Sequence, residues 1–405
     1  MEEIFLKSLK INKVRHLGEI DIQISENERK HLILTGKNGS GKTSVLEILK
    51  EYFEAVEINL IDFQLWESQA KNFKEALRLN DKHPARIKWQ RDLENLLGYI
   101  EKYISIVPVF QNFDMIFNVI KQGQFMFAHF PAQRGGPIYE VAQGPKKLTL
   151  DSQPNSVTER HNHLFLQYLV NLKTERSFAR DENDELSADT IDKWFVAFEN
   201  VLKQLYGEDV KLAFDRKEWN FYLLIDGYER FDLNHLSDGY AAIISIISEL
   251  LLRMEKYKNW SHDMQGIVLI DEIETHLHIE LQKKVLPFLT AFFPKLQFIV
   301  TTHSPFVLSS INNAVIFDLE KKERVEDLSG YSVENIIESY FDANQYSELL
   351  NKRVNEYDAL SNNAEHTAAE EARLKELEAY FQKFPLNIAP ELSLKLNTIR
   401  LKKIA

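Results

Sequence analysis

The sequence predicts an α/β fold in which a mixed sheet carries a phosphate-binding loop, with a helical insertion and a helical carboxyl-terminal extension. A short apolar strand, 32–35, runs into a glycine-rich loop and then into the helix 44–53. Two later apolar strands, 266–270 and 297–302, each end in polar residues suited to chemistry. Ligands of α/β domains bind at the carboxyl ends of parallel strands, so we expect these three strand ends to share one site.

The glycine-rich loop reads Gly36-Lys37-Asn38-Gly39-Ser40-Gly41-Lys42-Thr43 and fits the pattern G-x-x-x-x-G-K-[ST]. Its glycines allow the backbone to curl around a polyphosphate and to point N–H groups inward. The helix that follows presents the positive end of its dipole to the same anion. Lys42 is placed to bridge the β- and γ-phosphates, and Thr43 can offer its hydroxyl to Mg²⁺. The loop therefore predicts binding of a nucleoside triphosphate.

Composition is that of an ordinary globular protein of one large domain or two. The 405 residues are 44% hydrophobic and 27% charged, and no cysteine is available for disulfides or thiolate zinc sites. We find no candidate membrane span or signal peptide and expect a cytoplasmic protein. The net charge of -12 argues against an extensive nucleic-acid-binding surface, although a local basic patch is compatible with it.

Strands are predicted at 3–11 and 17–24, followed by a mostly helical insertion at about 54–122. Basic residues recur between acids in this insertion, which is typical of a solvated helix face; nucleic-acid contact is the alternative. A buried strand at 125–130 follows. Two helices are expected on either side of an exposed acidic stretch, and two strands after them, at 161–178, 188–206, 210–215 and 220–226. His161-Asn162-His163 spells the three letters that name a nuclease family. In that family these residues lie far apart in the sequence, so we treat the match as a coincidence and assign the stretch no chemistry.

A second group of candidate site residues begins at 236–240, which opens an apolar helix reaching about residue 254. The strand 266–270 ends in Asp271 and Glu272, of which one can hold Mg²⁺ while the other polarises the attacking water. The strand 297–302 ends at His303, which we expect to be functional because its strand should end near the same phosphates.

These motifs, in this order, resemble the ABC-type ATPases of the RecF, SMC and Rad50 kind, most closely the OLD-like ATPases of bacterial antiphage systems. The resemblance covers residues 1 to about 320 and implies ATP and Mg²⁺ as ligands. It implies that Asp271 binds magnesium, that Glu272 is the catalytic base and that His303 is the switch histidine. Residues 236–240 resemble the signature motif, so Ser237 and Gly239 would reach across a dimer to the γ-phosphate held by the other subunit.

The sequence departs from this family at three places. Asp238 and Tyr240 stand in place of residues of the usual signature Leu-Ser-Gly-Gly-Gln. His278 takes the place of the usual D-loop aspartate in the stretch 274–278. Gln133 is the candidate for the Q-loop glutamine, but Arg134 beside it could be the functional residue instead.

The carboxyl-terminal region, 321–405, is predicted to be helical and to dock a partner. It lacks the Asp-x-Asp pair expected of a fused OLD-like nuclease, so we expect a separate nuclease subunit. Residues 330–341 resemble the segment that follows the ATPase core in ATPases paired with an HNH nuclease, of the Septu and retron-associated type. A helical hairpin is expected at 345–383, with its turn at Asn362-Asn363. The basic, partly apolar tail 393–405 either docks the partner or packs on its own domain.

The resulting expectation is an ATPase domain over 1–320, with a signature subdomain at about 155–255, that acts as a sensor or regulator in an antiphage complex. It would form a homodimer or higher homo-oligomer through shared ATP sites, without membrane contact. DNA or RNA binding is left open. The alternatives are a RecF-like DNA repair clamp and, with less support, the nucleotide-binding subunit of a transporter.

Overall fold

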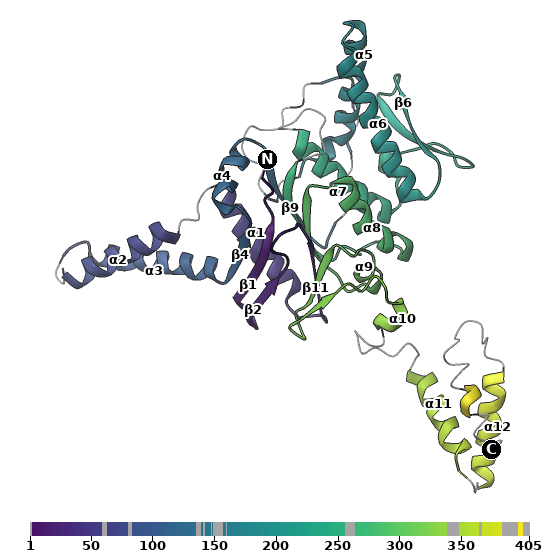
Figure 1. Cartoon of the computed structure of the whole chain (residues 1–405). Helices are drawn as coiled ribbons and strands as arrows, with labels where there is room; N and C mark the ends of the chain where they lie inside the picture. The colour runs from purple at the N-terminus through teal and green to yellow at the C-terminus, as the bar shows by residue number, and fades with distance from the viewer. Residues whose placement is uncertain are drawn as a thin grey trace. The chain divides into compact units, whose positions relative to one another are not determined.

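The computed structural model divides the chain into two compact units, Met1–Gly330 and Tyr331–Ala405, each of which is considered by itself (Figure 1). The structure describes residues 2–58, 63–79, 83–134, 139–140, 142–146, 148, 157–158, 160–255, 264–337, 348–363, 367–382 and 396–399. None of the helices within these ranges is long and apolar enough to span a bilayer.

A six-stranded sheet in the order β12-β11-β3-β10-β9-β5 forms the centre of the first unit. Five of its strands are parallel to their neighbours and only β12 is antiparallel, so the predicted mixed sheet is confirmed. The five parallel strands are buried along their whole length, which explains their continuous apolar sequences. The strands are β3 (His31–Thr35), β5 (Phe125–Phe130), β9 (Gln265–Ile270), β10 (Leu296–Thr301), β11 (Ala314–Asp318) and β12 (Glu323–Glu326).

A second, antiparallel sheet packs against the other side of helix α1 (Lys42–Glu57). Its strands are β2 (Leu17–Gln23), β1 (Leu6–Val14) and β4 (Ile106–Phe110). Helix α1 buries Leu49 and Phe53 between the sheets, and Phe53 stacks on Phe127 with ring centroids 4.3 Å apart. This core fixes the helix that follows the glycine-rich loop.

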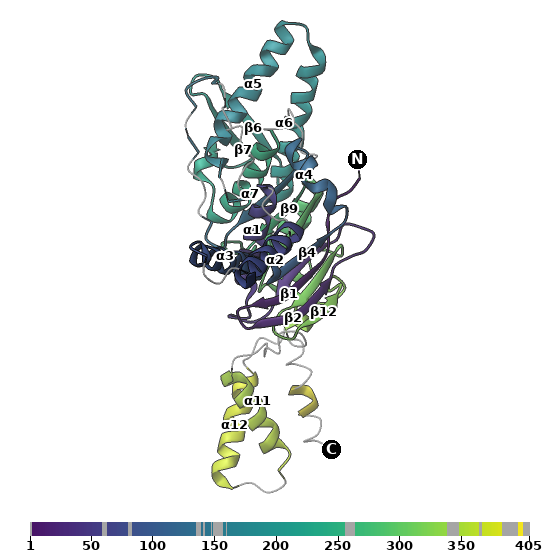
Figure 2. The same cartoon turned by 90° about the vertical axis from the view of Figure 1, so that its left-hand side faces the viewer.

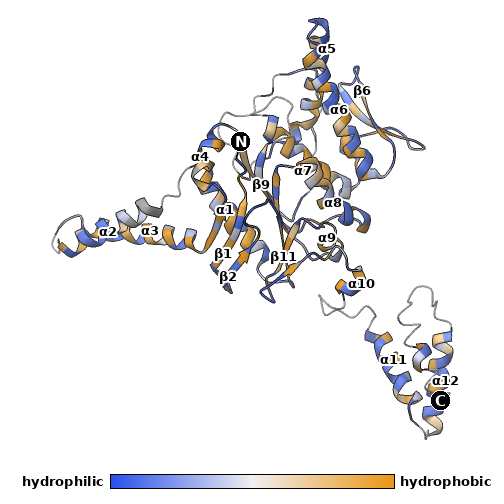
Figure 3. Ribbon diagram, in the orientation of Figure 1, coloured by the Kyte–Doolittle hydropathy of each residue, from blue (hydrophilic) through white to orange (hydrophobic). Residues whose placement is uncertain are grey.

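The insertion over 54–122 is mostly helical, as predicted, and it also contains a short strand, β4, that was not predicted. The insertion contains the helices α2 (Phe63–Leu79), α3 (Arg86–Ile104) and α4 (Phe113–Lys121). Residues 106–110 are extended because they pair with β1, for example Ile106 with Ile11, almost a hundred positions away. Helices α2 and α3 form a projecting hairpin of mixed hydropathy (Figures 1 and 3).

The middle of the chain forms a subdomain of helices and a small antiparallel sheet, which Figure 2 shows from a second side. The two predicted helices and two predicted strands are confirmed, with shifted ends. Asp184 caps α6 by accepting a hydrogen bond from the Ser187 N–H, and Gly207 ends it at a φ of 72°. The elements are η1 (Asn162–Leu164), α5 (Phe165–Asp181), α6 (Glu185–Tyr206), β6 (Val210–Asp215), β7 (Asn220–Ile225), β8 (Phe231–Asp232), η2 (Leu233–His235) and α7 (Asp238–Glu255). Helices α8 (Ile279–Phe292) and α9 (Pro305–Leu308) complete the unit.

The second unit contains the predicted hairpin as α11 (Glu348–Ser361) and α12 (Ala368–Gln382), after the short α10 (Val333–Asn335). Its core bears on the two alternatives that were left open for the basic tail. Leu396 and Ile399 are buried against Val354, Tyr357 and Phe381 of the hairpin, so these two side chains pack on their own unit. The rest of the basic tail lies outside the described residues.

Candidate nucleotide site

Four neighbouring strands of the central sheet end at the same edge, and each delivers predicted site residues there. The order β3-β10-β9-β5 places the glycine-rich loop, His303, Asp271 with Glu272, and Arg134 after successive strands. Because these strands are parallel, their carboxyl ends meet at one edge. Sheet topology therefore brings together segments that are far apart in sequence: at this edge the Thr302 N–H donates a hydrogen bond to the carbonyl of Leu34, 268 positions away, at 3.1 Å.

The glycine-rich loop has the backbone that a phosphate cradle requires. Gly36, Gly39 and Gly41 adopt φ angles of 131°, 83° and 99°, which other residues rarely accept. A Cβ atom at Gly36 would lie 2.9 Å from the Ser40 hydroxyl, and one at Gly41 would lie 2.7 Å from Leu17 Cδ1. The positive φ favours glycine at both positions, and the close side-chain contacts add to this preference.

Lys42 points back into the loop. Its ammonium donates hydrogen bonds to the carbonyls of Gly36 at 2.9 Å and Lys37 at 3.1 Å. Burial lowers the pKa of Lys42, while the neighbouring carboxylates of Glu272 and Glu274 act against that shift. A phosphate would supply this cation with a stronger partner than two neutral carbonyls.

The acids after β9 are held by the neighbouring strand β10. Asp271 accepts a hydrogen bond from the Thr301 hydroxyl at 2.6 Å, and that hydroxyl accepts one from the Glu272 N–H at 2.7 Å. Glu272 has a φ of 44°, the left-handed region that is costly for a residue with a side chain. Its carboxylate also accepts a hydrogen bond from Thr275 at 3.3 Å.

Between the two candidates after β5, the structure favours Arg134 as the residue in contact with the site. Gln133 is exposed, whereas Arg134 is buried and donates hydrogen bonds to the carbonyls of Asp271 at 2.6 Å and Glu272 at 2.9 Å. Burial lowers the pKa of Arg134 to about 10, so it remains a cation at neutral pH. The only sequence signal for this role was its place beside Gln133 after a buried strand.

His303 is anchored by a residue to which sequence reasoning gave no separate role. The His303 N–H donates a hydrogen bond to the Glu274 carboxylate at 2.5 Å. Burial lowers the pKa of the His303 ring, and the charge of Lys42 lowers it further. The imidazole is therefore neutral at physiological pH and can both donate and accept hydrogen bonds.

Several polar atoms around this edge are buried without a hydrogen-bond partner in the described part of the chain: Thr35 Oγ1, Ser40 Oγ, Arg134 Nε and Glu274 Oε2. Buried polar groups normally have partners, so their concentration beside the loop fits a polar ligand. Among the described residues, no cluster of three or more acids or histidines could hold a metal alone. The two predicted ligands, Thr43 and Asp271, would supply one hydroxyl and one carboxylate oxygen, and Mg²⁺ is commonly held by one or two protein ligands together with phosphate oxygens.

Ser237 and Gly239 lie at the start of α7, in a different pocket of about 590 Å³. His276 and His278 line it too, and none of the glycine-rich loop residues does. Gly239 approaches the backbone closely, since a Cβ there would lie 3.1 Å from the His276 carbonyl. The structure thus places the signature-like segment beside His276 and His278 of the D-loop-like stretch, in a pocket that no residue of the glycine-rich loop lines.

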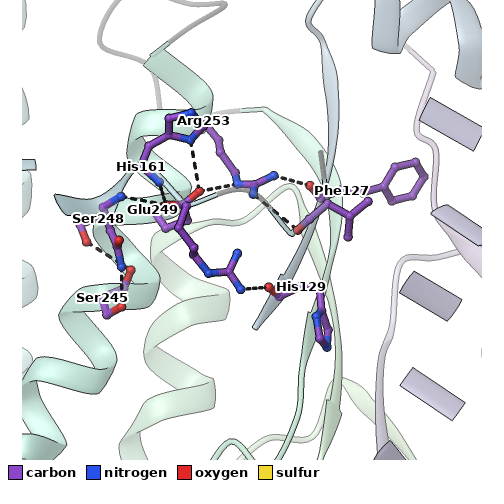
Figure 4. A network of polar contacts seen from close by, with 10 residues as sticks. Phe127, His129, His161, Ser245, Ser248, Glu249 and Arg253 are labelled. Atoms are coloured by element: carbon purple, nitrogen blue, oxygen red, sulfur yellow. Dashed lines mark hydrogen bonds and ion pairs between the residues drawn. The ribbon is translucent and has the colours of Figure 1, made fainter. Parts of the chain in front are cut away.

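Farther along α7, a buried ion pair joins this helix to β5 (Figure 4). Glu249 accepts hydrogen bonds from Arg253 at 2.7 Å and from the N–H groups of His161 at 2.5 Å and Asn162 at 2.9 Å. Arg253 also donates to the Phe127 carbonyl at 2.9 Å. His161 and Asn162 thus bind α7 through these hydrogen bonds, which give them a structural role.

The fold and the site together define a P-loop ATPase domain, with the strand-end acids of that class. The chain belongs to the family described as "AAA domain, putative AbiEii toxin, Type IV TA system", which matches residues 99–309, more than half of its length. This match includes the acids and His303, and the glycine-rich loop precedes it.

Two curated relatives are similar over part of the chain. The Septu protein PtuA of Bacillus mycoides (strain KBAB4) is 32% identical over 162 residues, which cover 38% of this chain and 23% of PtuA. The Retron Ec83 probable ATPase of Escherichia coli is 30% identical over 203 residues, which cover 48% of this chain and 33% of that ATPase. The matched part thus spans a third or less of each relative. Among solved structures, an SmcHead bound to the C-winged helix domain of ScpA matches 78% of this chain and 94% of that one, with a TM-score of 0.39 and 12% identity.

Proposed function

We propose that this protein binds and hydrolyses ATP as the sensor or regulator of an antiphage defence complex, together with a separate nuclease subunit. The observation that carries the ATPase proposal is the meeting of Lys42 with Asp271 and Glu272 at one edge of the sheet. The relatives named Septu PtuA and retron ATPase support the defence setting.

In this proposal each group at the sheet edge has one task. The N–H groups of residues 36–43 and the Lys42 ammonium bind the phosphates. Thr43 and Asp271 would hold Mg²⁺, which when bound would neutralise charge on the phosphate oxygens. Glu272 orients and polarises the attacking water, and Arg134 fixes the peptides that carry both acids. His303 contributes a neutral imidazole beside the γ-phosphate position.

Two substitutions test this assignment. Lys42→Ala should abolish ATP binding, because the cation facing the phosphates is lost. Glu272→Gln should still bind ATP but hydrolyse it about a hundredfold or more slowly, since an amide is a poor base. Glu94→Gln, on the exposed face of α3, is the matched control and should leave ATP binding and hydrolysis unchanged. Hydrolysis by Glu272→Gln at the parental rate would remove Glu272 from the role of base.

We further propose that each complete ATP site is shared by two subunits. Ser237 and Gly239 line a pocket without the loop of their own chain, which supports a role toward the ATP of a partner subunit. A mixture of Lys42→Ala and Ser237→Arg proteins should therefore regain one intact site in each mixed dimer. If well-mixed dimers show no recovery of ATPase activity, each site is built within one chain.

The nuclease, an HNH enzyme in our proposal, would bind the second unit through the basic tail. Deleting 386–405 would also remove Leu396 and Ile399 from the core of that unit, so loss of binding would be ambiguous. Lys402→Glu with Lys403→Glu changes the charge alone. Loss of nuclease co-purification with retained ATPase activity would support docking by the tail, whereas unchanged co-purification would place the docking surface elsewhere.

A further inference from the structure

The end of the α2–α3 hairpin carries a concentration of positive charge on a chain whose net charge is -12. Residues 71–91, here called the basic tip, contain seven Lys and Arg but only two acids. Most of these cations are exposed, and within the described residues the following form no ion pair: Lys71, Lys74, Arg78, Lys88 and Arg91. Leu79 and Ile87 on the same tip are 73% and 75% exposed. The tip therefore presents unpaired cations and uncovered aliphatic side chains together.

The end of the α5–α6 hairpin has the complementary composition. Residues 175–189, here called the acidic tip, contain six Asp and Glu but only two Arg, and both arginines pair with Asp192. The exposed acids without an ion pair in the described structure are Asp181, Glu182, Asp184, Glu185 and Asp189. Phe178 and Leu186 beside them are 54% and 81% exposed. Large apolar side chains thus accompany the charge here as well.

We propose that the basic tip of one copy of this chain docks on the acidic tip of a second copy. The two hairpins leave the first unit on different sides, and their tips do not meet in either view (Figures 1 and 2). The complementary surfaces therefore cannot cover each other within one chain. A contact between two different surfaces is heterologous, so it continues from copy to copy into a ring or an open chain.

The apolar residues decide between a protein and a nucleic acid as the occupant. A phosphate backbone would match the cations of the basic tip, but it offers nothing to Leu79 and Ile87. The acidic tip offers carboxylates to the cations and Phe178 and Leu186 to the aliphatic side chains. Contacts between two hairpin ends are small, so we expect an affinity on the order of micromolar that weakens as salt is added.

Charge reversal with rescue tests the contact on the full chain without nucleotide, so that assembly through ATP sites does not contribute. Sedimentation velocity at low salt should show species larger than the monomer. Lys74→Glu/Arg78→Glu/Lys88→Glu and Asp181→Lys/Glu182→Lys/Glu185→Lys should each weaken this association at least tenfold. Mixing the two triple variants should restore it, because the reversed tips complement one another and so do the unchanged ones. Lys211→Glu/Arg216→Glu/Lys217→Glu, on exposed positions of β6 and the turn after it, is the control with the same charge change and should associate like the parent.

A second variant tests the apolar part, because Leu186→Asp adds charge of the same sign to the acidic tip yet should weaken association. Unchanged association in either triple variant would overturn the proposal, and so would failure of the mixture to recover. If the basic-tip variant associates normally but loses binding of a short DNA duplex in fluorescence anisotropy, the tip is a nucleic-acid surface instead. None of these results depends on ATP hydrolysis.

Discussion

Replacing Arg253 with Met should be among the most destabilising substitutions in the first unit. Glu249 and Arg253 are both fully buried, and Met would remove the guanidinium that donates to Glu249 and leave this carboxylate with its contacts to His161 and Asn162. The Phe127 carbonyl would lose its donor as well. Removing one partner of a buried pair leaves an uncompensated charge, so we expect a loss of about 3–5 kcal/mol. Domains are commonly stable by only about 5–15 kcal/mol, which makes this loss easy to detect.

The pKa of Glu249 also shows how strongly its partners stabilise the charged carboxylate. Burial by itself would raise this pKa, but the hydrogen bonds from His161 and the charge of Arg253 outweigh it and lower the pKa to about 2. A carboxylate with a lowered pKa contributes stability above its unfolded pKa and loses it as the pH falls through the folded value. The comparison of variants therefore belongs at neutral pH, where Glu249 is fully charged.

Urea denaturation followed by tryptophan fluorescence measures this effect selectively, since all five tryptophans precede residue 331. Glu249→Gln combined with Arg253→Met should be more stable than Arg253→Met alone, because the buried charge is gone. Lys10→Met, which removes an exposed pair with Asp21, should change little. A loss below about 1 kcal/mol for Arg253→Met, or a double variant no better than the single one, would refute the reasoning.

Three further predictions follow from buried side chains. Arg134→Met should slow ATP hydrolysis about 10- to 100-fold while ATP affinity changes less, because this residue holds the peptides of Asp271 and Glu272; equal losses in both would contradict a positioning role. Burial lowers the pKa of His31 to about 4, so the unfolded chain binds a proton between pH 7 and pH 5 that the folded chain does not. The protein should therefore lose about 2 kcal/mol of stability over this range. In urea titrations, the stability of His31→Gln should depend less on pH than that of the parent. Leu396→Ala should destabilise the second unit by about 2–5 kcal/mol, measured by circular dichroism on that unit's transition, whereas the exposed Asn397→Ala should not.

The features that could be predicted from the sequence alone are those whose residues lie within one segment. The glycine-rich loop needs glycine at positions whose φ is positive, and the spacing of Gly36, Gly41 and Lys42 is therefore readable without a structure. The buried parallel strands are continuous apolar runs ended by polar residues, so the sequence also indicated Asp271, Glu272 and His303. Helices α11 and α12 were predictable from apolar spacing for the same reason: each pattern lies within one segment.

Pairings between distant segments were decided only by the tertiary structure. Strand β4 is extended because β1 provides its hydrogen bonds, and nothing within residues 106–110 contains that information. Arg134 contacts the peptides of Asp271 and Glu272 because β5 lies beside β9, although 137 positions separate the arginine from the first acid. Leu396 was equally compatible with a partner or with its own unit until the hairpin was seen to cover it. Side-chain composition specifies what a residue can bind, whereas the fold determines which partner is within reach.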